Sequence, residues 1–121
     1  INNNKLENYK EEKDMIVRND DVILNELGKG VSRKVLSHVS NMMMVEVNFI
    51  KGAVGEIHEH VNEQISYIIK GSFELTVGGK KELVKAGDTF YIKPSELHGV
   101  LALEDSTILD VFTPQRDDFL K

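Results

Sequence analysis

Glycine spacing limits the fold of this chain more than any other feature of its sequence. Nine glycines lie between positions 28 and 99 of the 121 residues, and the residues between them form short apolar runs rich in β-branched and aromatic side chains. Gly78 and Gly79 predict a two-residue hairpin turn, because both turn positions tolerate a positive φ. Short strands with frequent turns are typical of a sandwich or small barrel, so we expect an all-β domain. The expected strands cover residues 33–37, 42–50, 65–69, 72–77, 81–84, 89–92, 99–102 and 107–112.

Composition limits the number of domains and the kinds of partner that we expect. Residues 1–14 are polar and predict a loose N-terminal arm or a short helix, which leaves 15–121 as a single domain. With 15 Lys and Arg against 20 Asp and Glu, the net charge is −5, so the chain lacks the basic surface that nucleic acid or an anionic membrane requires. No apolar run approaches the roughly 18 residues of a membrane span. Cysteine is absent, which excludes thiolate chemistry and fits a cytoplasmic location.

Two histidines separated by one residue are the strongest chemical signal. His58 and His60 would project from one face of a strand, because strand side chains alternate, and both imidazoles could then reach one metal ion. Gln64 follows at a spacing that could return its amide oxygen to the same ion, and His98 follows the 89–92 strand. Taken alone, such a histidine pair could equally reflect surface or packing roles. His38 has no comparable neighbours and is interpreted as structural.

These residues together resemble the two motifs of the cupin superfamily. Residues 52–71 match the first motif (Gly, five residues, His, one, His, three or four, Glu, six, Gly), except that Gln64 stands at the acid. Gly87 and His98 match the second motif, although Lys93 stands where a proline is usual and Ser95 where a glycine is usual. The resemblance implies a double-stranded β-helix, or jelly-roll barrel, around one divalent metal ion. The metal ligands it implies are His58, His60, Gln64 and His98.

A glutamine at this position changes the charge of the predicted site. Three neutral imidazoles and a neutral amide leave the divalent charge uncompensated, so the site should attract an anionic ligand and act as a Lewis acid. The set also differs from the two-histidine, one-carboxylate arrangement of non-haem iron oxygenases. Glu63 is the weaker candidate, because its spacing is one residue too short and alternation turns it away. Imidazole and amide ligands suit Ni, Zn, Fe, Mn, Co or Cu, so the metal identity stays open.

A second group of candidate residues lies near the C-terminus. Asp110 and Phe112 share one face of the expected 107–112 strand. If that face is interior, apolar surroundings should raise the pKa of the acid, which suits proton transfer near neutral pH. Arg116, just past Pro114, could curl back over the rim and bind a carboxylate through its guanidinium. The alternative is that Asp110 pairs with a nearby cation, Phe112 is core and Arg116 faces solvent.

The same segments resemble the small pectin-degradation cupins. The resemblance rests on His58-x-His60-x3-Gln64 and on residues 107–120. It implies a metal-dependent enzyme that converts 4,5-unsaturated uronate monosaccharides, released by polysaccharide lyases, to linear keto sugars. In that reaction Asp110 would be the acid/base, Phe112 would shape the pocket and Arg116 would bind the uronate carboxylate.

Two other functions remain open at this point: a cupin dioxygenase of a small molecule, and a non-catalytic sugar-binding cupin. The expected partner is a small anionic sugar, with neither nucleic acid nor a membrane. Cupins often dimerise through N-terminal strands, and residues 22–27 could serve here, so we expect a homodimer.

Overall fold

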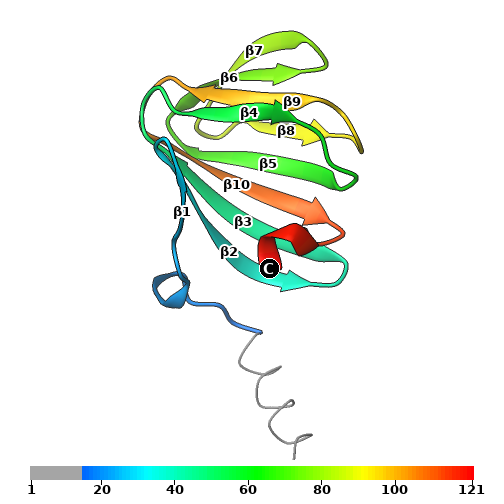
Figure 1. The fold of residues 1–121 in the computed structure, drawn as a ribbon. Coiled ribbons are helices and arrows are strands. Elements are labelled where there is room, and N and C mark those ends of the chain that lie inside the picture. Colours follow the sequence, from blue (N-terminus) through cyan, green and yellow to red (C-terminus); the bar gives the residue numbers. More distant parts are fainter. Residues whose placement is uncertain (1–14) are drawn as a thin grey trace, which may run out of the picture.

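A computed structural model describes residues 15–121 (Figure 1). The predicted arm at residues 1–14 lies outside the described residues. The strands and the two short 3₁₀ turns, η1 and η2, follow in chain order as η1 (Asn19–Asp21), β1 (Asn25–Gly28), β2 (Val31–Val39), β3 (Met42–Phe49), β4 (Val54–His58), β5 (Glu63–Lys70), β6 (Ser72–Val77), β7 (Lys80–Lys85), β8 (Thr89–Ile92), β9 (His98–Ala102), β10 (Ser106–Thr113) and η2 (Asp117–Leu120). The all-β prediction is confirmed. Between residues 15 and 121, neither helical segment has the length and apolar character needed to cross a membrane.

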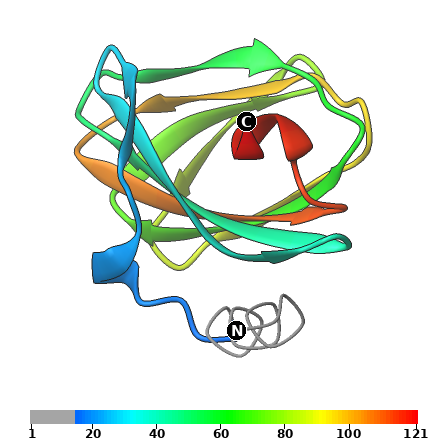
Figure 2. The ribbon, with the colours of Figure 1, turned by 60° about the horizontal axis from the view of Figure 1, so that its bottom comes forward.

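The strands form two antiparallel sheets. One sheet has six strands in the order β1-β2-β3-β10-β5-β8, and the other has four in the order β4-β9-β6-β7. The late strand β10 lies between β3 and β5, and β9 lies between β4 and β6, so each sheet joins segments far apart in sequence. Figure 2 shows the strands closed around a central space, with η2 inside the outline of the barrel.

Strand alternation sends one line of side chains into the barrel. Along β5, Gln64, Ser66 and Ile68 are buried while the residues between them are exposed. On the neighbouring β10, Ile108 pairs with Ile68, and both belong to a core that draws on the two sheets. The members of that core are Phe49, Ala53, Ile68, Phe73, Ala102 and Ile108. The buried side chains of β5 are therefore apolar at Ile68 and polar at Gln64.

Three glycines show why two of the turns lie where they do. Gly78 and Gly79 have φ values of 55° and 81° and join Val77 to its partner Lys80, as the hairpin prediction requires. Gly71 has φ +83°, and a Cβ there would overlap the Ser106 side chain and lie 2.7 Å from the Asp105 carbonyl oxygen. Gly71 therefore lets the β5–β6 turn pack directly against the start of β10.

Candidate metal centre and catalytic cavity

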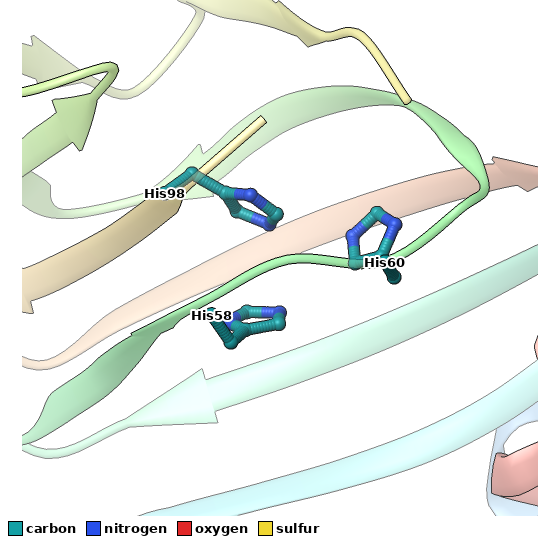
Figure 3. Close-up of side chains that lie close together, drawn as sticks. All are labelled: His58, His60 and His98. Atoms are coloured by element: carbon teal, nitrogen blue, oxygen red, sulfur yellow. The ribbon is translucent and has the colours of Figure 1, made fainter. Parts of the chain in front are cut away.

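Three histidines converge on a common space, as Figure 3 shows. His58 ends β4 and His98 begins β9, and these two residues are direct partners in the strand register. The ring centroids of the three histidines lie 4.4–5.5 Å apart, and one possible ligand atom from each lies within 4.8 Å of the others. His98 is buried, His60 is partly buried and His58 is exposed. This group could hold a metal ion.

His60 reaches the cluster by a route that differs from the one expected. The strand β4 ends at His58, so His60 does not share a strand face with it. Instead, the backbone N–H of Ser95 donates to the His60 carbonyl at 2.7 Å, which joins the two motif segments. Ser95 has φ +60°, a conformation that favours glycine, at the place where the cupin motif usually has one.

Backbone carbonyls set the tautomer of all three rings. Each Nδ1–H donates to a carbonyl oxygen, and the pairs are His58 with Glu56 (2.8 Å), His60 with Asn62 (3.0 Å) and His98 with Glu96 (2.7 Å). Because a carbonyl only accepts, we assign the proton of each neutral ring to Nδ1, which leaves the lone pair on Nε2. Backbone support of the second nitrogen is common in metal-ligating histidines. Burial lowers the pKa of His60 and lowers the pKa of His98 to about 4, which favours the neutral, ligating form.

Gln64 adds an oxygen to the cluster. Its Oε1 lies 3.0 Å from His60 Nε2, while its Nε2 donates to Ser66 Oγ at 2.8 Å and to Asp110 Oδ1 at 3.2 Å. The amide oxygen therefore faces the lone pair of an imidazole, and two acceptors at this distance require a cation or a proton between them. The donor set fits a transition metal held by imidazole nitrogens and one amide oxygen.

Asp110 lies beside this ligand set. The register pairs it with Ser66 on β5 and with the fully buried Val45 on β3. Ser66 Oγ–H donates to Oδ1 at 2.6 Å, the same oxygen that accepts from Gln64. Over residues 15–121, Oδ2 has no hydrogen-bond partner. Burial raises the pKa of Asp110 to about 6, although the Ser66 hydrogen bond and the charge of Arg116 oppose the shift. Such an acid can exchange a proton near neutral pH.

A cavity of about 270 Å³ joins the two groups of predicted residues. His58, Gln64 and His98 line it together with Asp110, Phe112 and Arg116, and apolar side chains form most of the remaining wall. Phe112 is buried, and its ring centroid lies 5.5 Å from that of His60. The space therefore combines an apolar wall with a few polar groups, as small-molecule sites do.

Arg116 returns to this cavity from beyond the end of β10. Its side chain is only 11% exposed, and its guanidinium carbon lies 5.2 Å from the Phe112 ring centroid. Nε and Nη2 donate to the two carboxylate oxygens of Asp118 at 3.0 and 2.8 Å, a bidentate geometry typical of carboxylate recognition. The segment is fixed by Asn62, which is buried and donates to the Pro114 carbonyl at 2.7 Å.

Residues outside the predicted set also contribute. Ser66 bonds to Asp110, and Arg33 lines the cavity. Both could have been found from alternation, because Arg33 shares a strand face with Val31 and Ser66 shares one with Gln64. No sequence signal points to the buried amide of Asn62.

Two residues that are not among the predicted metal ligands lie away from the histidine cluster. His38 is exposed and its Nδ1 lies 3.1 Å from Gln115 Oε1. Glu63 is exposed and accepts a hydrogen bond from the Tyr91 hydroxyl. Glu63 thus takes the outer face of β5 and Gln64 the inner face, as strand alternation predicts.

Comparison with known proteins agrees with this architecture. The family model described as "Cupin domain" matches residues 45–112. The chain belongs to the cupin family. This cupin is 43% identical over 103 residues to the "Pectin degradation protein KdgF" of Dickeya dadantii, a match that covers 84% of this chain and 94% of that protein.

Solved structures extend the agreement to three dimensions. An RmlC-like cupin from Shewanella frigidimarina NCIMB 400 superposes with a TM-score of 0.83 at 32% identity, over 86% of this chain and 94% of that one. The structure of KdgF from Halomonas sp. gives a TM-score of 0.82 at 37% identity, over 86% of this chain and 96% of that one. The predicted cupin fold and the predicted likeness to pectin-degradation cupins are confirmed.

Proposed function

We propose that this cupin converts 4,5-unsaturated uronate monosaccharides to linear keto sugars during the breakdown of pectin or related polyuronates. The proposal rests on one observation: Asp110 is hydrogen-bonded to Gln64 in a cavity that His58, His98 and Arg116 also line. A candidate ligand set, an acid with a raised pKa and an anion-binding group therefore share one space. The 43% identity to a pectin degradation protein supports the same substrate class.

One divalent transition metal would be held by four neutral ligands. These are Nε2 of His58, His60 and His98 and Oε1 of Gln64. When bound, the ion would supply positive charge that polarises a sugar oxygen. Imidazole and amide donors suit Ni, Zn, Fe, Mn, Co or Cu.

Arg116 and Asp110 have separate tasks in the proposed reaction. The substrate is an enol ether conjugated with a carboxylate, and its isomerisation needs the carboxylate anchored and one proton moved from oxygen to carbon. The Arg116 guanidinium would anchor the carboxylate, using the bidentate geometry it now shows toward Asp118. Asp110 would take the proton from the anomeric hydroxyl as the ring C–O bond breaks, and return it to C4 as the C5 enol becomes a ketone. Its unpartnered Oδ2 is the suitable atom.

The test combines elemental analysis of the purified protein with incubation on unsaturated uronates released by polysaccharide lyases. Loss of the ultraviolet absorbance of the conjugated double bond is the expected result. Asp110→Asn should keep its metal and its fold yet lose this activity. Unchanged absorbance across several unsaturated uronates would reject the proposed function.

The same experiment separates the rival functions. A cupin dioxygenase would consume oxygen in an oxygen electrode, whereas the proposed isomerisation consumes none. A non-catalytic sugar-binding cupin would bind the uronate and return it chemically unchanged. The neutral amide of Gln64, in place of a carboxylate ligand, favours the isomerase over an oxygenase of the two-histidine, one-carboxylate type.

We also propose that the protein is a homodimer in the cytoplasm. Strand β1 is an edge of the six-stranded sheet, and the residue Ile23 just before it is 79% exposed. The outer face of the same sheet exposes further large apolar side chains, including Met42, Ile65 and Tyr91. Light scattering at the mass of one chain would contradict the dimer, and cell fractionation tests the location.

A further inference from the structure

Arg33 brings a second guanidinium to the cavity that Arg116 lines. It lies on β2 and is part of the cavity wall, and its guanidinium carbon is 3.7 Å from the centroid of the Phe119 ring. Its Nε is buried, and residues 15–121 offer that atom no hydrogen-bond partner. Buried donors are nearly always satisfied, so an unpaired guanidinium nitrogen at a cavity wall indicates a missing acceptor.

Both guanidinium groups lie over the same aromatic ring, that of Phe119. The Arg116 guanidinium carbon lies 4.2 Å from the same Phe119 centroid, so the two guanidinium carbons are no farther apart than the sum of the two distances to that ring. Burial lowers the pKa of Arg33 and the charge of Arg116 lowers it further, whereas the charge of Asp118 raises it. Arginine nevertheless stays charged at neutral pH. This part of the cavity therefore holds two positive charges.

Asp118 is the carboxylate bonded to this pair. Both carboxylate oxygens of Asp118 accept from Arg116. Arg33 makes no ion pair with any of the residues 15–121. The Arg33 guanidinium thus has no carboxylate bonded to it, although the charge of Asp118 acts on it from farther away, and a carboxylate is the acceptor whose geometry matches an open guanidinium fork.

We propose that Arg33 and Arg116 bind the carboxylate of the substrate together, and that Arg33 makes the cavity selective for uronates over neutral sugars. This inference rests on the proposed function for its substrate class. A carboxylate that contacts both groups supplies an acceptor for the Arg33 guanidinium and adds negative charge beside the two arginines. Arg33 is then a binding and specificity residue, with no part in proton transfer.

The test measures binding of D-galacturonate, a saturated uronate that cannot undergo the reaction, to the metal-loaded protein by NMR titration. Arg33→Gln should weaken this binding about tenfold or more, the loss typical of a charge-assisted hydrogen bond. Arg33→Lys should weaken it less, because lysine keeps the charge but not the planar fork. D-galactose, the neutral counterpart, should bind equally to the wild type and to Arg33→Gln.

Lys34→Gln is the matched control. It removes the same charge from the adjacent residue of β2, whose Nζ bonds to Asn19 rather than to the cavity, and it should leave galacturonate affinity unchanged. Equal galacturonate affinity in wild type and a folded Arg33→Gln would overturn the proposal. So would an equal loss in Lys34→Gln, an equal loss for galactose, or no galacturonate binding by the wild type. If Arg33→Gln does not fold, the galacturonate and galactose affinities of Arg33→Lys are compared with those of the wild type in the same way.

Turnover separates this inference from the proposed function. A wild type that binds galacturonate through Arg33 but leaves unsaturated uronates unchanged would reject the proposed function and retain the arginine pair. If the wild type converts unsaturated uronates but a folded Arg33→Gln binds galacturonate as tightly as the wild type, the arginine pair is rejected and the proposed function is retained.

Discussion

Asp110→Asn should abolish turnover and yet stabilise the metal-free protein at high pH. Burial, the largest cause, raises the pKa of Asp110 from 3.8 to about 6. The folded state then holds this proton more tightly than the unfolded state, so stability is lost as pH rises from the unfolded pKa through the folded one. At about 1.4 kcal/mol for each pKa unit, the full cost is about 3 kcal/mol. Residual solvent contact reduces it to about 2 kcal/mol above pH 7. At pH 5 about half of this cost applies.

Asparagine removes that cost and keeps the hydrogen-bond network. Its Oδ1 can still accept from Ser66 and Gln64, as the Asp110 Oδ1 does, and it has no charge to bury. Relative to wild type, the variant should therefore gain about 2 kcal/mol at pH 8 and about 1 kcal/mol at pH 5. Turnover of the metal-loaded variant should fall at least about 100-fold, the loss expected for a missing general acid or base.

Urea unfolding followed by circular dichroism measures the gain, with both proteins freed of metal by a chelator. Asp20→Asn, at an exposed acid in η1, serves as the control and should show no pH-dependent gain. The reasoning is refuted if Asp110→Asn is less stable than wild type at pH 8, or if its advantage is the same at both pH values. Full activity in Asp110→Asn would independently refute the acid/base assignment.

Three further predictions follow from other parts of the structure. Gly71→Ala should cost more than about 2 kcal/mol in urea unfolding, because the new Cβ would overlap Ser106 at φ +83°. Since burial lowers the pKa of His98 to about 4, the metal-free protein should lose stability from this group as pH falls from 6.5 through 4. His98→Ala should flatten that part of the pH–stability curve. Arg116→Gln should raise KM for unsaturated uronates by about tenfold or more, and an unchanged KM would argue against carboxylate binding by Arg116.

Local rules account for what the sequence predicts correctly. The hairpin at Gly78 and Gly79 depends only on backbone freedom at two neighbouring residues, and its register follows from the turn. The inward positions of Gln64 and Asp110 follow from strand alternation once each strand is recognised. By contrast, β1 and β4 lie outside the eight predicted runs, because Asn25–Gly28 is poor in strand-forming residues and Val54–His58 is interrupted by Gly55. Each was anticipated only in part, by the N-terminal strand expected at residues 22–27 and by the strand expected to carry His58.

The parts that escaped prediction depend on contacts between distant segments. His60 lies past the end of β4, and its position depends on a hydrogen bond from Ser95, which no spacing rule anticipates. The contact of Arg33 with the Phe119 ring, 3.7 Å from its guanidinium carbon, depends on the C-terminal turn. Asp118 pairs with Arg116 only in the folded turn. These arrangements depend on tertiary structure rather than on the composition of any one segment.

Asn62 connects metal binding at His60 with sugar binding at Arg116. Its carbonyl accepts from the Nδ1–H of His60, and its amide donates to the Pro114 carbonyl, two residues before Arg116. A metal that orders His60 would thus also order the segment that presents Arg116 to the sugar. Since such coupling is reciprocal, uronate should tighten metal binding by the same factor by which metal tightens uronate binding. The sugar affinity of the protein would then follow the supply of its metal.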